Sequence, residues 1–238
     1  MAKKLKYKRI LLKLSGEVFK GEKEYGFDAK TLNEFAKMIV KLQKMGVQVG
    51  IVNGGGNLWR FRDFEHLKLD RVVSDTMGMM ATIMNAMALR DAIEKNKGKV
   101  VAMSAFTCEK AMPDYEPLAA RSALDEGNIV IFAGGTGSPF FTTDSAAALR
   151  ALEIQADVLL KATKVDYVYD KDPMKHKDAK KFKKMKYQQV IEDGLGVMDL
   201  TCASLCKSGD LPMLVFNVNK KSNLENIVLG KEIGTYIN

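Results

Sequence analysis

The sequence predicts an α/β protein, specifically a three-layer α/β/α sandwich with a mostly parallel central sheet. Short apolar segments alternate with helix-like segments along most of the chain, which is the pattern of strands joined by crossover helices. Several apolar segments end in loops rich in glycine or threonine, and parallel sheets bind ligands at such carboxyl ends. The chain has 238 residues, 47% of them hydrophobic, which is enough for a single domain with its own core.

The first half of the chain contains four predicted strands and two predicted helices. Residues 9–14 (RILLKL) form a short apolar strand that carries one charged residue, Lys13. Asp28 is a suitable N-cap for the first helix, because the residues after it repeat apolar positions at helical spacing. The remaining strands are assigned to residues 48–52, 99–104 and 128–133, and the second helix to residues 74–96.

The second half begins with an alanine-rich helix, predicted for residues 144–155, and a buried strand at 158–162. A long polar segment, 163–186, follows without a clear period. Two helical stretches then lead to a last strand at 214–217. The chain changes character near 156–160, so a boundary between two parts of the domain is expected there.

The formal net charge of +8 is concentrated in two short segments. Residues 1–9 contribute +5 and residues 175–186 contribute +6, so the rest of the chain carries −3. Only 7 of the 37 basic residues are arginine, the residue that most often reads bases and clamps phosphate backbones. The distribution therefore argues against a nucleic-acid-binding protein and favours two solvated segments. Attraction of polyanionic nucleotides is the alternative.

Cysteine and histidine usage excludes several kinds of site. Cys202 and Cys206 lie four residues apart in a helical stretch, but His66 and His176 belong to unrelated segments, so no set of four metal ligands assembles. No catalytic triad is credible with two histidines, and nothing requires a disulfide. No apolar run is expected to span a membrane, which takes about 20 residues. The absence of a signal-like start predicts a cytoplasmic protein that does not contact a membrane.

The loops at the strand ends have the composition of a phosphoryl-transfer site. They are KLSG at 13–16, GGGN at 54–57 with Arg60, GGTGSP at 134–139 with TTD at 142–144, and KATKVD at 161–166. Glycine lets backbone N–H groups approach anionic oxygens, and lysine neutralises a phosphoryl group during transfer. No P-loop motif and no G-x-G-x-x-G motif occurs, which argues against P-loop kinases and dinucleotide binding.

These segments resemble the amino acid kinase superfamily and, within it, the bacterial UMP kinases. The resemblance runs from Arg9 to about Ile237. Its further motifs are KLSGE at 13–17, RVVSDTMGMMAT at 71–82, MNAMALRDA at 84–92, AGGTGSPFFTTDSAA at 133–147, YDKDP at 169–173 and VMDL at 197–200. It implies an ATP-dependent phosphorylation of UMP to UDP in pyrimidine nucleotide biosynthesis, assisted by Mg²⁺.

The resemblance also implies roles for individual residues. Those expected at ATP are Lys13, Leu14, Ser15, Gly16, Gly56, Arg60, Thr163, Tyr169 and Asp172. Those expected at UMP are Gly55, Asp75, Thr136, Gly137, Ser138, Pro139, Phe140, Phe141, Thr142 and Thr143. Lys13 is expected to stabilise charge on the transferred group, with Asp144 and Asp199 organising lysine and Mg²⁺, which the ATP phosphates mainly hold. A carboxylate that bonds both ribose hydroxyls predicts a preference for UMP over dUMP.

Residues 1–238 are thus expected to form one domain, in which about 1–157 hold UMP and subunit contacts and about 158–238 hold ATP. The resemblance implies a homohexamer and feedback inhibition by UTP at the UMP site. The methionines Met77, Met80, Met84 and Met87 recur at helical spacing. Their spacing indicates a core or helix-packing face, and it also makes the helix a candidate subunit contact.

The chain departs from the family pattern at several positions. Ser138 replaces a usual asparagine, Phe61 follows Arg60 where glycine is usual, and Tyr167 replaces the common glycine of KVDGVY. Members activated by GTP commonly carry basic or aromatic residues where this chain has Glu94, Val101, Pro117 and Asn128. We therefore expect little or no activation by GTP. The lysine-rich segment 175–186 has no assigned role.

Three other readings stay open at this stage. One is a related phosphotransferase acting on a carboxylate or carbamate, against which the TGSPFFTTD motif argues. Another is a nucleotide sensor without catalysis, against which intact Lys13, Asp144 and Asp199 argue. The third is a nucleic-acid-binding protein that uses the lysine segments. Individual residues also have structural alternatives, since Asp75 and Asp144 could cap helices and Tyr169 could be ordinary packing.

Overall fold

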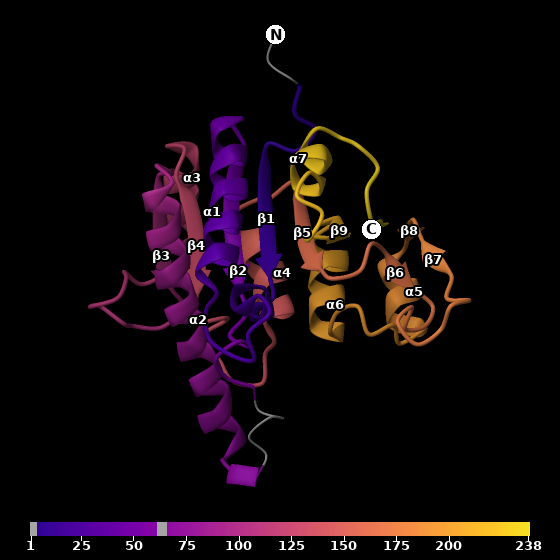
Figure 1. The fold of residues 1–238 in the computed structure, drawn as a ribbon, viewed down its shortest axis with the longest axis horizontal. Coiled ribbons are helices and arrows are strands. Elements are labelled where there is room, and N and C mark those ends of the chain that lie inside the picture. The colour runs from indigo at the N-terminus through magenta and orange to yellow at the C-terminus, as the bar shows by residue number, and fades with distance from the viewer. Residues whose placement is uncertain (1–3, 61–65) are drawn as a thin grey trace.

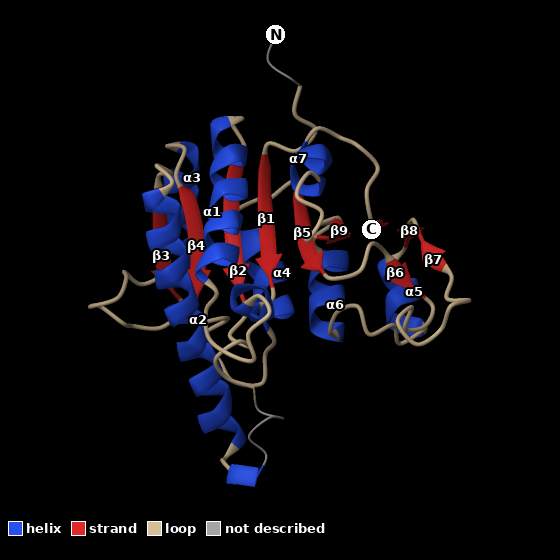
Figure 2. Ribbon diagram, in the orientation of Figure 1, coloured by secondary structure: helices blue, strands red, loops and turns tan. Residues whose placement is uncertain are grey.

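The computed structural model describes residues 4–60 and 66–238, and an eight-stranded sheet forms its centre (Figures 1 and 2). In spatial order its strands are β3 (Val100–Ser104), β4 (Ile129–Ala133), β2 (Gln48–Asn53), β1 (Arg9–Leu14), β5 (Val158–Thr163), β9 (Met213–Asn217), β10 (Thr235–Ile237) and β8 (Lys184–Met185). Neighbouring strands are parallel except β10 and β9, which are antiparallel. Two short strands, β6 (Val168–Tyr169) and β7 (Lys181–Phe182), form a separate antiparallel hairpin.

Helices cover both faces of the sheet, so the predicted three-layer sandwich is confirmed (Figure 2). One face carries α1 (Ala29–Lys44), α2 (Arg71–Lys95) and α7 (Asn223–Val228). The other carries α3 (Pro117–Asp125), α4 (Thr143–Glu153), α5 (Tyr187–Glu192) and α6 (Leu200–Ser208). A short 3₁₀ helix, η1 (Gly16–Lys20), follows β1.

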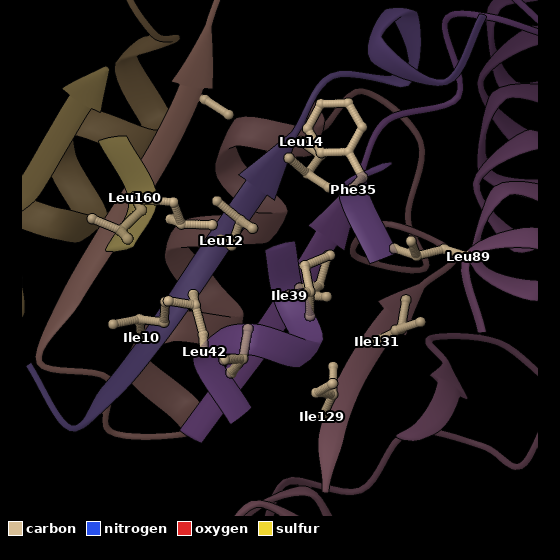
Figure 3. Packing of buried hydrophobic residues seen from close by; sticks show 14 of the residues in the cluster. Ile10, Leu12, Leu14, Phe35, Ile39, Leu42, Leu89, Ile129, Ile131 and Leu160 are labelled. Atoms are coloured by element: carbon tan, nitrogen blue, oxygen red, sulfur yellow. The ribbon is translucent and has the colours of Figure 1, made fainter. Parts of the chain in front are cut away.

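The side chains of β1 show how the two cores are divided. Ile10, Leu12 and Leu14 pack toward α1 and α2, as Figure 3 shows. Leu11 belongs to the core beneath α4, and alternation along a strand places Lys13 on that same face. The single charge in the RILLKL strand therefore points toward the N-terminus of α4.

Helix starts agree with the sequence at α1 but differ at two other helices. Asp28 caps α1 by accepting a hydrogen bond from the Thr31 N–H at 2.7 Å, as predicted. Helix α2 begins at Arg71 with Asp70 as its cap, three residues before the predicted start. Its cap is therefore not Asp75. Likewise, Thr142 caps α4, which leaves the Asp144 side chain available for other contacts.

Several elements carry too short a pattern to be predicted from sequence. Strands β6, β7 and β8 have two residues each, so the polar segment 163–186 shows no period. Helix α3 has nine residues and starts with Pro117 directly after the capping Glu116. Proline at the first turn is a local start signal, since its missing N–H would be unpaired there anyway.

Helix α2 corrects the expectation that no segment is long and apolar enough to cross a membrane. In the part of the chain that the structure describes, it alone passes that test by length and composition, with a mean hydropathy of 1.2 over 18 residues, 39% of them buried. Its buried face packs on α1 and the sheet. Met80 and Met84 are 55% and 53% exposed, so the methionine stripe lies on the outer face and not in the core.

The topology brings the predicted site loops to one edge. Strand β1 lies between β2 and β5, and the chain order along the sheet reverses there. All three strands are parallel, so their carboxyl ends meet at the same edge. Such a switch point is where open parallel sheets bind ligands.

Candidate active site

Two lysines and one carboxylate form the centre of this edge. Lys13 on β1 and Lys161 on β5 are register partners on adjacent parallel strands. Asp144, the second residue of α4, lies between them. The Lys13 Nζ is 2.8 Å from Asp144 Oδ1, and Lys161 Nζ donates a short hydrogen bond to Asp144 Oδ2.

All three side chains are largely buried. The exposed fractions are 11% for Lys13, 12% for Lys161 and 17% for Asp144. Burial raises the pKa of Asp144, but the Lys13 and Lys161 charges lower it further, so its pKa lies below the ordinary value. Burial and the nearby Lys13 charge together lower the pKa of Lys161, although Asp144 opposes them. The group carries two positive charges against one negative charge, and a phosphate anion would restore neutrality.

Asp199 holds α4 and α6 together and makes no described contact with either lysine. Its Oδ1 accepts hydrogen bonds from the Ser145 hydroxyl at 2.7 Å and the Cys202 N–H at 2.9 Å, and its Oδ2 accepts one from Thr142. Burial raises the pKa of Asp199, but these hydrogen bonds lower it below the ordinary value. Its carboxylate thus fixes the start of α4, where Asp144 lies.

The glycine loops after β1 and β2 are in close contact. A Cβ at Gly16 would lie 2.5 Å from the Gly56 N and 2.6 Å from the Gly54 O, so no other residue fits there without movement. The Gly54 N–H donates to the Leu14 carbonyl at 2.9 Å. The Asn85 Nδ2 donates to the Gly54 O at 2.7 Å and fixes the loop from α2. These contacts set backbone N–H groups of both loops beside one another.

Arg60 lies at the same edge. Its Nε donates to the Gly56 carbonyl at 3.0 Å, and its guanidinium forms an ion pair with Glu17. Glu17 also pairs with Lys164 at 3.0 Å. The three residues join the loops after β1, β2 and β5. Phe61, the departure next to Arg60, lies outside the described residues.

A cavity of about 180 Å³ opens beside this centre. Of the residues expected at UMP, it is lined by Gly55, Asp75, Thr136, Ser138, Phe141, Thr142 and Thr143. Gly137, Pro139 and Phe140 belong to the same loop but do not line the cavity. Residues that the sequence did not single out also line it, namely Trp59, Ser74, Gly78, Met79, Thr82 and Gly135.

Asp75 connects α2 to the loop after β4. Its Oδ2 accepts the Phe140 N–H at 2.8 Å, and both its oxygens accept from the Arg71 Nε at 2.8 and 2.9 Å. On the other side, the Gly134 N–H donates to the Thr82 hydroxyl at 2.7 Å. Helix α2 thus positions both ends of the loop that lines the cavity.

The residues expected at ATP divide into two groups. Lys13, Gly16, Gly56 and Arg60 lie together at the centre. Thr163, Tyr169 and Asp172 follow β5 and continue into the β6 hairpin. The Thr163 hydroxyl lies 2.8 and 3.1 Å from the Val165 and Phe216 carbonyls.

The remaining residues of this set have local roles. Asp172 accepts the Met174 N–H at 2.9 Å. Leu14 is fully buried in the core, so its backbone, not its side chain, faces the edge. Ser15 precedes η1 as its cap residue.

The sequence analysis missed Lys161 as a site residue, although a signal for it exists. The strands RILLKL and VLLKAT share the pattern of buried apolar residues interrupted by one lysine. A lysine inside a buried strand needs a partner. The register of β1 and β5 then gives the two lysines a common one.

Comparison with known proteins places this geometry in a family. The model of the amino acid kinase family matches residues 8–217. The chain belongs to the amino acid kinase family. Among family members, uridylate kinases from Pseudomonas paraeruginosa PA7 and Pseudomonas aeruginosa PAO1 are each 50% identical over 236 residues, covering 99% of this chain and 96% of the relative.

Solved structures of family members have the same fold. The UMP kinase from Bacillus anthracis gives a TM-score of 0.95 at 37% identity, covering 98% of this chain and 96% of its own. The UMP kinase from Ureaplasma parvum gives 0.92 at 33% identity, covering 98% and 100%. The uridylate kinase from Archaeoglobus fulgidus gives 0.76 at 30% identity, covering 96% and 99%.

Proposed function

We propose that this member of the amino acid kinase family transfers the γ-phosphoryl group of ATP to UMP, giving ADP and UDP. The observation that carries this proposal is the Lys13–Asp144–Lys161 group beside the cavity at the switch point. Its relatives with 50% identity over nearly the full chain are named uridylate kinases. A cavity lined by Asp75 and backbone-rich loops suits a nucleoside, which the carboxylate and carbamate alternatives do not require.

The residues support an in-line transfer without covalent catalysis. A phosphate oxygen of UMP forms the new bond to the γ-phosphorus while the bond to the β–γ bridging oxygen breaks and ADP leaves. Such transfer needs alignment and neutralisation of the equatorial oxygens. Lys13 and Lys161 supply this charge, and Asp144 keeps both ammonium groups in place.

Substrate contacts follow from this arrangement. Gly55 and the loop from Thr136 to Thr143 are assigned to UMP, with Asp75 accepting the ribose hydroxyls. Lys13 to Gly16, Gly56 and Arg60 are assigned to the ATP phosphates. Thr163, Tyr169 and Asp172 are assigned to its nucleoside end. The parts 1–157 and 158–238 then hold the acceptor and the donor, respectively.

Mg²⁺ fits the site only together with the nucleotide. No three His, Cys, Asp or Glu side chains among residues 4–60 and 66–238 come close enough to hold a metal ion. Asp144 is held by two lysines and Asp199 by three donors. We therefore assign Mg²⁺ to the ATP phosphates, where it would neutralise charge on the transferred group.

Assembly and regulation form the finer part of the proposal. The outer face of α2 exposes Met80, Met84 and Met87 and suits a contact between copies in a homohexamer. UTP is proposed to inhibit by occupying the UMP cavity. GTP is proposed to have little effect, because Glu94 and Val101 offer neither positive charge nor an aromatic ring. The enzyme is proposed to act in the cytoplasm.

ADP release from Mg-ATP with a panel of acceptors tests the proposed reaction. The panel is UMP, CMP, dUMP, dTMP, acetylglutamate, aspartate and carbamate. UMP is expected to be the preferred acceptor, and Lys13→Ala is expected to abolish its turnover. Equal or better turnover of acetylglutamate, aspartate or carbamate would refute the nucleotide assignment. Tight UMP binding without turnover would instead support a sensor.

A further inference from the structure

A second cavity, of about 440 Å³, lies away from the active site. Its lining is formed by two chain segments that are far apart in the sequence, the N-terminal basic segment and the lysine-rich segment 175–186, together with the loop after α7 and Tyr167. We call it the basic cavity. It is lined by Lys6, Tyr7, Tyr167, Lys183, Lys184, Leu214, Lys231, Glu232, Ile233, Gly234 and Tyr236.

Backbone contacts hold the walls of the basic cavity together. The Lys6 N–H donates to the Val228 carbonyl at 2.9 Å, which fixes the N-terminal segment beside α7 (Figure 1). The Tyr236 N–H donates to the Lys183 carbonyl at 3.0 Å. The Val168 N–H donates to the Thr235 hydroxyl at 2.9 Å and ties Tyr167 to the same place. The cavity is thus built from ordered strands and their connections.

The floor of the cavity is a row across the sheet. Tyr236 on β10 is the register partner of both Leu214 on β9 and Lys184 on β8, so the three side chains share one face. Tyr7 is buried at one side. The floor therefore offers two aromatic rings and an apolar side chain below the lysines.

The charge in the basic cavity is uncompensated. Four lysines face one acidic residue, Glu232, which gives the lining a net charge of +3. Within the described part of the chain, none of Lys6, Lys183, Lys184 or Lys231 forms an ion pair. Like charges gathered around one hollow repel one another, and a bound polyanion relieves this repulsion.

Aromatic rings accompany these charges. The Lys6 Nζ lies 5.0 Å from the centre of the Tyr7 ring, and the Lys181 Nζ lies 4.8 Å from that of Tyr167. Tyr167 is the residue at which the sequence departs from the glycine of related chains. A planar heterocycle stacks well on such rings. The volume lies within the range of about 300–1,000 Å³ that is usual for small-ligand sites.

We propose that the basic cavity binds a nucleoside di- or triphosphate, with its phosphates on the lysines and its base against the tyrosines. The site is separate from catalysis. Tyr7 and Lys13 lie at opposite ends of β1, six residues apart, or about 20 Å at about 3.3 Å per residue. This proposal gives the lysine-rich segment 175–186 a role and does not depend on the acceptor that the enzyme phosphorylates.

Affinity labelling tests the proposal on the full chain. Ribose-oxidised dialdehyde forms of ATP, GTP, CTP and UTP react with lysines near a bound nucleotide, and borohydride reduction followed by peptide mapping locates them. At least one of these probes is expected to label Lys183, Lys184 or Lys231 at least tenfold faster than Lys175 and Lys177. These two control lysines lie in the same segment but do not line the cavity. The unmodified parent nucleotide should suppress the labelling.

Two variants separate the parts of the proposal. Lys183→Glu combined with Lys231→Glu should reduce labelling of Lys184 at least tenfold and leave labelling of Lys13 and Lys161 unchanged. Lys175→Glu combined with Lys177→Glu, with the same change in charge, should leave labelling of Lys184 within twofold. Tyr167→Gly, which creates the residue of related chains, should weaken nucleotide protection several-fold but not protection by inorganic tripolyphosphate.

Three outcomes would overturn the proposal. One is labelling spread equally over the cavity lysines and the control lysines. Another is the absence of labelling in the cavity with all four probes. The third is protection by tripolyphosphate as strong as that by every nucleotide, which would mean a site for phosphate chains alone.

Discussion

The two ends of β1 carry lysines in opposite states. At the carboxyl end, Lys13 and Lys161 are buried and share Asp144. At the amino end, the lysines of the basic cavity are exposed and have no carboxylate partner in the described chain. The comparison teaches that charge is useful for catalysis when a partner holds it in a fixed place. Charge without a partner is free to attract a ligand but is not positioned for a reaction.

The largest expected effect comes from making the catalytic end resemble the other one. Asp144→Asn removes the shared partner and leaves two buried ammonium groups uncompensated. We expect kcat to fall by about 10²–10³. Breaking a buried pair is also expected to cost about 3–5 kcal/mol of stability. Steady-state kinetics and urea unfolding measure both quantities.

An exposed ion pair provides the control. Asp125→Asn removes the partner of Arg9, where Asp125 is 62% exposed. Exposed pairs contribute about 0–1 kcal/mol, so its stability and kcat should stay near those of the native enzyme. Equal effects of the two substitutions would contradict the importance of burial.

Asp75 tests the other carboxylate of the catalytic end. Asp75→Asn is expected to raise the KM for UMP by about tenfold, because a hydrogen bond to a charged group contributes about 1.5–3 kcal/mol. The preference for UMP over dUMP should shrink as well. Asp70→Asn is the matched control, since Asp70 caps the same helix without lining the cavity and asparagine is an equally good cap. An unchanged ratio of UMP to dUMP turnover would exclude Asp75 from ribose recognition.

The pH dependence distinguishes the buried lysine from an ordinary one. The pKa of Lys161 lies below its usual value, so the charged form that catalysis needs is lost at a lower pH than for a free lysine. Lys161→Arg keeps its charge throughout this range. We expect the alkaline limb of kcat to move to higher pH in this variant, whatever its maximal rate. An alkaline limb at the native position would assign it to another group.

The pKa of Asp144 acts on stability in the opposite pH range. It is lowered in the folded protein, so its contribution is present above the unfolded value of about 3.9 and is lost as pH falls through the folded value. In Asp144→Asn this part of the acid dependence of unfolding should disappear.

The smallest effect concerns the support of Asp144. Thr142 caps α4 and donates to Asp199, so Thr142→Ala removes both contacts. Loss of a cap costs about 1 kcal/mol, measurable by urea unfolding. Thr142→Ser keeps the hydroxyl and should retain most of that stability. Equal destabilisation by the two variants would mean that the methyl group, not the hydroxyl, is responsible.

The sequence was sufficient for the sandwich and for the edge that carries the site. The apolar strands are short and regular, and their glycine-rich ends place Lys13, Gly55 and Gly56 at the switch point without any structure. The cap of α2 was not predictable, since Asp70 and Asp75 both precede apolar helical residues. Lys161 was missed because its partner comes from register, and register between distant strands is not visible in either strand alone.

The basic cavity shows the same limit more strongly. The sequence revealed two lysine-rich segments but gave no reason for residues 4–9 and 181–184 to meet. Pairings of β10 with β9 and β8, three short strands, bring them together. Pairing of two- and three-residue strands depends on the surrounding tertiary structure and carries almost no local signal.

The most direct test of the account is the kcat for UMP of Lys13→Met, Lys161→Met and the double variant at saturating Mg-ATP. The account predicts that each single substitution lowers kcat by about 10²–10³, with the KM for UMP nearly unchanged. The double variant should lose much less than the product of the two, because the lysines act as one unit. A folded Lys161→Met enzyme with a kcat within a few-fold of native would contradict the shared role of the two lysines.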